Sequence, residues 1–217
     1  MAAYADAYLT DGSPLAADAV TLSPYLGVGA LEPAFEAAEK SGRGVFVLAL
    51  TSNPEAPAVQ RAVNGGRSIA QTVVDAAAER NASASPIGGI GLVVGATISD
   101  LGVDLGALNG PVLAPGFGEQ GATLSDMRTL FGKSLRSVLP ATSRAVLRAG
   151  PEVFALRRRH CAPVTRSCRP SVTTDVPRVI PPGMATHVVL GYPRSVRSPA
   201  PDPETPTPRR KSWPFPS

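Results

Sequence analysis

Hydrophobic residues in the first 156 positions follow two patterns that alternate along the chain. One pattern is a short apolar run without a helical period, and it predicts buried strands. In residues 44–50 (GVFVLAL) the run is continuous, as is typical of a parallel strand that is covered on both faces. The predicted strands are 17–23, 44–50, 90–96, 110–116 and 137–143.

The other pattern has the spacing of a helix and occupies the segments between these strands. The predicted helices are 2–9, 30–42, 68–80, 122–132 and one that begins at 144–150, with a weaker helical stretch at 99–108. One helix followed by five strand-then-helix units indicates parallel strands joined by right-handed crossovers. This order predicts an α/β fold that is either part of a (β/α)8 TIM barrel or a doubly wound sheet. A complete barrel takes about 250 residues.

The pattern ends near Arg157, which divides the chain into a barrel-like domain at 1–156 and a different segment at 157–217. The second segment holds 13 of the 23 prolines and carries 11 basic against 3 acidic residues. Because proline is excluded from helix interiors and central strands, we expect this basic tail to be disordered. Its stretch PAPDPETPTPRRK (199–211) leaves open a polyproline ligand or an RNA-binding arm, although a solvated tail without a role is favoured.

Charge and composition exclude several classes of protein. The pI of 9.4 comes from the tail, since residues 1–156 carry a net charge of −4, so no nucleic-acid partner is expected. No apolar run is long enough to form a membrane helix, and MAAYADAYLTDG (1–12) lacks the features of a secretory signal. We therefore expect a cytoplasmic protein without a membrane partner.

The few metal-ligating residues near the C-terminus do not form a recognisable site. Cys161 and Cys168 lie beside His160, with His187 further along, and this spacing fits no standard zinc pattern. We expect no metal ion.

A glycine-rich motif follows the strand at 110–116. Gly116, Gly118 and Gly121 form a G-x-G-x-x-G pattern, whose backbone N–H groups can hold a phosphate. A dinucleotide site also needs an acidic residue about 20 positions further on. After Asp126 the next acidic residue is Glu152, so this interpretation is disfavoured.

A barrel offers a second interpretation of the motif, because the loops after its last two strands commonly bind a substrate phosphate. In that arrangement Arg144 lies at the C-terminal end of the last strand, where a guanidinium can clamp a phosphate with two hydrogen bonds. Gln120 can donate from its side-chain amide in the preceding loop. A surface arginine at a helix start is the alternative for Arg144, but a cation there opposes the helix dipole.

Several motifs in order resemble orotidine 5′-phosphate decarboxylase of the second, bacterial class. They are SPLAADAVTLSPYLG (13–27), RGVFVLALTSNPEAPAVQ (43–60), LAPGFGEQG (113–121) and LPATSRAVLRAGP (139–151). The resemblance implies a (β/α)8 barrel, here its last five βα units, that usually forms a homodimer with active sites at the strand C-termini. It also implies a reaction without a cofactor, in which orotidine 5′-phosphate loses CO2 to give UMP.

The resemblance implies roles for individual residues as well. Ser52 would hydrogen-bond the pyrimidine amide, and Pro115 would pack beside the base. Gln120, in a closing loop, would reach phosphate and base. Arg144 and the loop backbone, which includes Gly116 and Gly118, would hold the phosphate.

One part of the family pattern is missing from the sequence. The family's chemistry rests on an Asp-x-Lys-x-x-Asp motif, which lies upstream of a stretch that resembles MAAYADAYL (1–9). No such motif occurs in the 217 residues, and Lys40, Lys133 and Lys211 are not at predicted strand C-termini. We therefore expect a truncated chain that is inactive as a decarboxylase. A frameshift in the gene near residue 157 would account for the change at the C-terminal edge of the match. A misplaced start codon or a second frameshift would account for the N-terminal edge. The alternatives are a non-catalytic phosphate-ligand binder or nonfunctional remnant and, less favoured, a nicotinamide-binding oxidoreductase.

Overall fold

The computed structural model describes residues 1–148, 150 and 151, so the predicted tail at 157–217, with its cysteines and histidines, lies outside the described residues. The helices are α1 (Ala2–Leu9), α2 (Glu32–Ser41), α3 (Ala56–Gln60), α4 (Ile69–Asn81), α5 (Leu124–Phe131) and α6 (Arg144–Leu147), with 3₁₀ turns at Val28–Leu31 and Gly132–Ser137. The strands are β1 (Ala19–Leu22), β2 (Gly44–Leu50), β3 (Val63–Asn64), β4 (Arg67–Ser68), β5 (Ile90–Val94), β6 (Val112–Pro115) and β7 (Val138–Ala141). None of the helices in this described part is long and apolar enough to cross a membrane.

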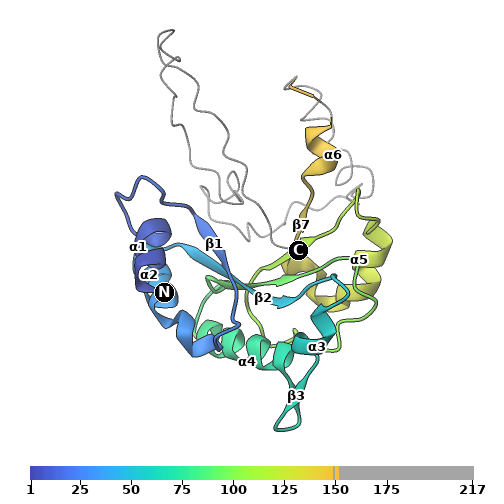
Figure 1. Cartoon of the computed structure of the whole chain (residues 1–217), viewed down its shortest axis with the longest axis horizontal. Helices are drawn as coiled ribbons and strands as arrows, with labels where there is room; N and C mark the ends of the chain where they lie inside the picture. Colours follow the sequence, from blue (N-terminus) through green and yellow to red (C-terminus); the bar gives the residue numbers. More distant parts are fainter. Residues whose placement is uncertain (149, 152–217) are drawn as a thin grey trace, which may run out of the picture.

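Five of the strands form one parallel sheet in the order β1-β2-β5-β6-β7. Every neighbouring pair is parallel, so the predicted set of five parallel strands is confirmed. Within the described residues, β1 and β7 each pair along one edge only, and the sheet is therefore open. The short β3 and β4 form a separate antiparallel hairpin that projects beyond α4 (Figure 1).

The helices α1, α2, α4 and α5 lie along the outer face of the curved sheet, whereas α6 lies beyond the end of β7 (Figure 1). On that side α4 packs against β2 and β5, α2 packs against β2, and α1 packs against β1 and α2. The core between them contains Val45, Val47 and Leu92, all at most 1% exposed. Phe46 and Val93 belong to a second buried cluster, because alternate residues of a strand point to opposite faces. Burial of both faces accounts for the continuous apolar pattern of residues 44–50.

The predicted helix at 99–108 is wrong, because this segment is an irregular loop. Several of its backbone groups bond to side chains of other elements instead of forming a helical ladder. The Asp104 N–H donates to Gln71 Oε1 over 2.8 Å, and Arg61 donates to two carbonyl oxygens of the loop. Gly102 has a positive φ, which an L residue in a helix does not adopt.

Two small elements between β2 and α4 are absent from the predicted set. In α3, Pro57 occupies a first-turn position, where its missing N–H costs no hydrogen bond. The β3–β4 hairpin turns at Gly65 and Gly66, both with positive φ, as a two-residue hairpin turn of type I′ requires.

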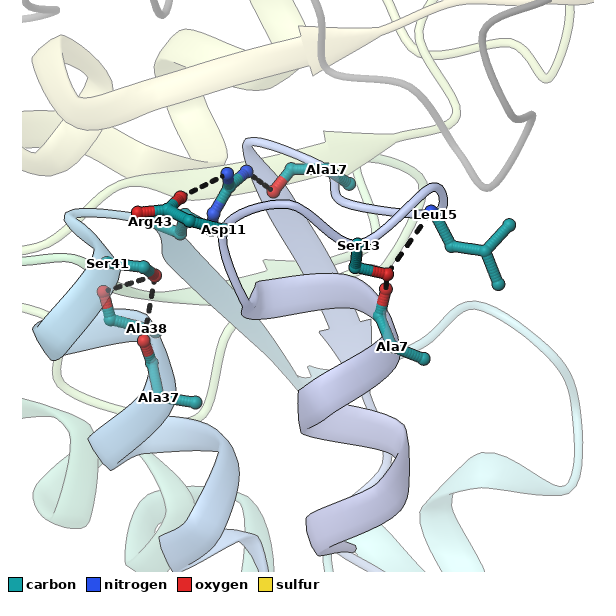
Figure 2. A network of polar contacts seen from close by, with 9 residues as sticks. All are labelled: Ala7, Asp11, Ser13, Leu15, Ala17, Ala37, Ala38, Ser41 and Arg43. Atoms are coloured by element: carbon teal, nitrogen blue, oxygen red, sulfur yellow. Dashed lines mark hydrogen bonds and ion pairs between the residues drawn. The ribbon is translucent and has the colours of Figure 1, made fainter.

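Arg43, just before β2, connects that strand to the segment that leads into β1 (Figure 2). Its guanidinium donates to the Ala17 carbonyl oxygen over 2.6 Å and to Asp11 Oδ1 over 2.8 Å. Nearby, the Ser13 hydroxyl donates to the Ala7 carbonyl oxygen over 2.6 Å, which closes the turn after α1. These contacts hold the edge strand β1 in place beside β2.

Candidate functional site

The carboxyl ends of parallel strands meet at one edge of a sheet, and the sequence-predicted site residues lie at that edge. Ser52 follows β2 by two residues, Pro115 ends β6, Gly116, Gly118 and Gln120 lie in the loop after β6, and Arg144 opens α6 directly after β7. Because β6 and β7 are neighbours, the glycine loop and α6 start from adjacent strands. Ser52 is separated from that loop by β5.

Ser52 is exposed and lies beyond the carboxyl end of β2, beside the end of β5. The two strand ends are joined there by a hydrogen bond from the Gly95 N–H to the Leu50 carbonyl oxygen, 2.9 Å long. Gly95 also leaves room for the serine, since a Cβ on Gly95 would lie 3.3 Å from the Ser52 nitrogen and 3.5 Å from its Cβ. The Ser52 side chain is therefore accessible to a ligand while its backbone is packed against β5.

The glycine loop is closed by its own hydrogen bonds. The Gly118 N–H donates to the Ala122 carbonyl oxygen, the Gly121 N–H to that of Gly118, and the Ala122 N–H to that of Gly116. All three glycines have positive φ, a backbone conformation that favours glycine at each position. The N–H groups of Gly118 and Gly121 are thus used within the loop in this conformation.

Other backbone N–H groups of the glycine loop are not used in these internal hydrogen bonds. The N–H groups of Phe117, Glu119 and Gln120 have no acceptor among the described residues. Glu119 and Gln120 are exposed, so their N–H groups, together with the Gln120 side-chain amide, are the donors best placed to meet an anion.

Small residues let the loop lie close to its neighbours. A Cβ on Gly116 would come within 3.1 Å of Thr97 Cγ2, beyond the end of β5, and one on Gly118 would lie 3.9 Å from Thr142 Oγ1, beyond β7. The loop therefore fits between the ends of two strands.

Two arginines follow β7. Arg144 is exposed and has no carboxylate partner among the described residues. Arg148 forms an ion pair with Glu119, with 2.5 Å between Nη1 and Oε2. This ion pair connects the glycine loop to the segment after α6, and neither partner was singled out from the sequence.

A pocket of about 660 Å³ lies between the loop after β5 and the start of α5. Of the residues predicted from the sequence, Gln120 and the motif glycine Gly121 line it, and two carboxylates, Asp100 and Asp126, lie in its wall. Hydrogen bonds from the Thr123 hydroxyl and N–H hold the pKa of the Asp126 carboxyl below its usual value, so this group is an anion at neutral pH. Because like charges repel, this pocket does not suit a phosphate. The side of the glycine loop that is near Arg144 is therefore the better candidate for a phosphate site.

The comparisons with known proteins agree with this arrangement of strands and loops. The sequence model described as "Orotidine 5'-phosphate decarboxylase / HUMPS family" matches residues 1–158. The chain belongs to this family. The fold class and the family resemblance inferred from the sequence are therefore confirmed.

Relatives within the orotidine 5′-phosphate decarboxylase family are longer than the matched region. The enzyme of Salinispora arenicola is 59% identical over 174 residues, which are 80% of this chain and 62% of the relative. That of Streptomyces coelicolor is 56% identical over 159 residues, 72% of this chain and 57% of the relative. The chain thus spans between 57% and 62% of the length of these two curated relatives.

Solved structures of the family superpose on the described fold. A crystal structure of a Streptomyces avermitilis protein assigned to the orotidine 5′-phosphate decarboxylases has a TM-score of 0.70 at 54% identity, over 73% of this chain and 56% of that one. The orotidine 5′-phosphate decarboxylase of Leishmania donovani has a TM-score of 0.52 at 29% identity, over 72% and 58% of the two chains.

The two lysines in the described region lie away from the strand C-termini. Lys40 is in the last turn of α2, just before β2 begins, and is therefore at the opposite edge of the sheet. Lys133 is in the 3₁₀ turn before β7. Asp18 also lies at the opposite edge, where its carbonyl oxygen accepts the Gly44 N–H. None of the three belongs to the edge that carries Ser52 and Arg144.

Proposed function

We propose that this chain contains the base- and phosphate-binding part of an orotidine 5′-phosphate decarboxylase site, and that it binds orotidine 5′-phosphate and UMP. The observation that carries the proposal is the common edge of β2, β6 and β7, where Ser52, the glycine loop and Arg144 are found. Neighbouring strands are about 4.8 Å apart, so β2 and β6 are separated by roughly 10 Å. The pyrimidine amide and the phosphate of UMP are a comparable distance apart, because both the ring of the base and the ribose lie between them.

Each residue has a distinct role in the proposed complex. The Arg144 guanidinium and the N–H groups of Glu119 and Gln120 hold the phosphate through charge-assisted hydrogen bonds. Ser52 hydrogen-bonds the pyrimidine amide, and Pro115, at the end of β6, packs beside the base. No cofactor is required for these interactions.

We further propose that the 217 residues bind the nucleotide without decarboxylating it. Binding accelerates a reaction only where the interactions are stronger in the transition state than in the ground state. In this family those interactions come from the Asp-x-Lys-x-x-Asp motif, which the 217 residues do not contain. Lys40 and Lys133 cannot replace it from their positions, and a homodimer of this chain would lack the motif in both subunits.

Titration calorimetry with UMP, ribose 5-phosphate and NAD tests the binding proposal. We expect UMP to bind more tightly than ribose 5-phosphate, because only UMP has a base for Ser52, and we expect no binding of NAD. Absence of binding by any of the three would favour a nonfunctional remnant, and preferential binding of NAD would favour an oxidoreductase.

Genetic complementation tests the proposal about chemistry. Residues 1–217 are expressed in a uracil-requiring strain that lacks its own decarboxylase, beside a full-length relative as the positive control. We expect no growth without uracil from residues 1–217. Growth would show that other residues of this chain carry the reaction.

A further inference from the structure

Gln60, the last residue of α3, holds the first residue after β2 with both ends of its side-chain amide. The Thr51 N–H donates to Gln60 Oε1 over 2.9 Å. In return, Gln60 Nε2 donates to Thr51 Oγ1 over 2.8 Å. Two hydrogen bonds between one pair of residues define both the position and the orientation of the strand end.

These two bonds also determine the direction of a longer chain of hydrogen bonds. Because Gln60 Nε2 donates to the Thr51 hydroxyl, the hydroxyl proton is free to point elsewhere, and it donates to Asn53 Oδ1 over 2.7 Å. That contact turns the Asn53 amide so that Nδ2 faces Glu55 Oε2 at 3.0 Å. The hydrogen bond from Asn53 lowers the pKa of the Glu55 carboxyl, with a smaller contribution from the backbone.

Ser52 lies between the two residues that this chain of hydrogen bonds fixes. Its own side chain is exposed and has no hydrogen-bond partner among the described residues. On its other side, the Gly95 backbone packs against it. The backbone of Ser52 is therefore held on three sides, while its hydroxyl is left for a ligand.

We propose that Gln60 is a positioning residue for recognition of the nucleobase, acting on the ligand through Thr51 and Ser52. This inference rests on the proposed function, because it assumes that Ser52 meets the base. Gln60 does not touch the ligand. Gln60 fixes the turn around Ser52 in the folded chain before the ligand binds. The entropy cost of ordering this turn therefore falls on folding and does not reduce the binding affinity.

The consequence is specific to one part of the ligand. When Gln60 is replaced by alanine, Thr51 loses a donor and an acceptor and the turn around Ser52 becomes free to move. The glycine loop and Arg144 come from other strands and stay unchanged. Affinity for a nucleotide should fall, whereas affinity for the same sugar phosphate without a base should not.

The chain offers a matched control in Gln71. This glutamine also lies on a helix and also holds a loop by both ends of its amide, accepting from the Asp104 N–H over 2.8 Å and donating to the Asp104 carbonyl oxygen over 3.4 Å. Its loop carries none of the proposed ligand contacts. If loss of any glutamine that holds a loop weakened ligand binding, Gln71→Ala and Gln60→Ala would change the Kd values equally.

The experiment measures Kd for UMP and for ribose 5-phosphate with the full chain and its variants. We expect Gln60→Ala to weaken UMP binding about tenfold, the cost expected when the freed residues around Ser52 must be ordered on binding, and to change ribose 5-phosphate binding less than about twofold. Gln71→Ala should change neither. Gln60→Glu keeps the acceptor for the Thr51 N–H but loses the donor, and should fall between wild type and Gln60→Ala.

Equal weakening of both ligands, or no change in either, would overturn the role of Gln60 while leaving the proposed function intact. Failure of the wild-type chain to bind UMP more tightly than ribose 5-phosphate would refute the proposed function, and the role of Gln60 with it. Amide hydrogen exchange gives a readout that needs no ligand: exchange at Thr51 should accelerate in Gln60→Ala but not in Gln71→Ala. Unchanged exchange at Thr51 would also overturn the proposal.

Discussion

Glu119 in the glycine loop pairs with Arg148 after α6, with 2.5 Å between the carboxylate and guanidinium atoms. The Arg148 side chain is 70% exposed. Such an exposed pair contributes little to folding, about 0–1 kcal/mol. Its position matters more, because it places an acid beside the donors proposed to hold a phosphate.

Replacing Glu119 by glutamine should therefore strengthen UMP binding. Removal of a negative charge lowers the repulsion of the phosphate, and we expect an increase in affinity of about threefold at low salt that fades near about 1 M salt, where the Debye length is about 3 Å. Calorimetric titration at two salt concentrations measures this effect. A weaker affinity at low salt would mean that the ion pair itself shapes the binding loop.

Replacing Arg144 by alanine should weaken UMP binding by about 1.5–3 kcal/mol, the range for a hydrogen bond to a charged group. Ribose 5-phosphate should be weakened to the same extent, because Arg144 is proposed to meet only the phosphate. Lys40→Ala is the control, since it removes a cation from the opposite edge of the sheet. Equal UMP affinities of wild type and Arg144→Ala would exclude this arginine from the site.

Asn81 is a buried polar residue that stabilises the opposite end of β5. Its amide donates to the carbonyl oxygens of Ile90 and Leu108 over 2.7 and 2.9 Å, and its Oδ1 accepts the Ile90 N–H over 3.2 Å. Asn81→Ala leaves these backbone groups buried without partners, at a cost of about 1–3 kcal/mol each. We expect urea denaturation to show a loss of about 3 kcal/mol or more, whereas Asn64→Ala, on the exposed hairpin, should change stability by less than about 0.5 kcal/mol.

Asp126 should make the stability of α5 depend on pH. Its pKa is lowered in the folded chain by hydrogen bonds from Thr123, so the unfolded chain binds more protons as the pH falls. The stabilising contribution is thus present above the ordinary aspartate pKa of about 3.9 and is lost as the pH falls through the lower, folded value.

Thermal denaturation of wild type and Asp126→Asn between pH 3 and pH 7 tests this dependence. The difference in Tm should be largest near neutral pH and should decrease toward the acidic end. In a Thr123→Ala background, which removes the first cause of the shift, the difference should be smaller throughout. A difference in Tm that does not vary with pH would contradict the assignment.

The open sheet should make the isolated chain prone to association. Among the described residues β1 and β7 each have one unpaired edge, and Tyr25 and Leu26, just after β1, are 81% and 86% exposed. Unpaired edges and exposed apolar side chains favour aggregation. We expect light scattering after size exclusion to show associated material and calorimetry to show a broad transition. A monodisperse sample with a sharp cooperative transition would refute this expectation.

Local sequence pattern was sufficient for the five strands, most of the helices and the family. Residues 44–50 could be identified as a buried strand because a continuous apolar run can be buried only where both faces are covered. The order of short motifs at the strand ends was also enough for the family resemblance. The apolar run and the short motifs each depend on residues that are neighbours in the chain, so both can be recognised without knowledge of distant contacts.

Tertiary contacts decided the rest, and the loop at 99–108 shows why. Its local pattern is weakly helical, but Gln71 and Arg61 bind its backbone groups from other elements. The glycine loop is similar: its G-x-G-x-x-G pattern predicts free N–H groups, whereas two of the glycines donate within the loop.

The sequence alone therefore determined the parallel α/β fold, the family and the edge at which Ser52 and Arg144 lie. Only the tertiary structure decided that Gln60 holds Thr51 and that Glu119 pairs with Arg148. The physical reason is that periodicity records which face of an element is buried. Hydrogen bonds and ion pairs depend instead on which donor and acceptor folding brings within about 3 Å of each other.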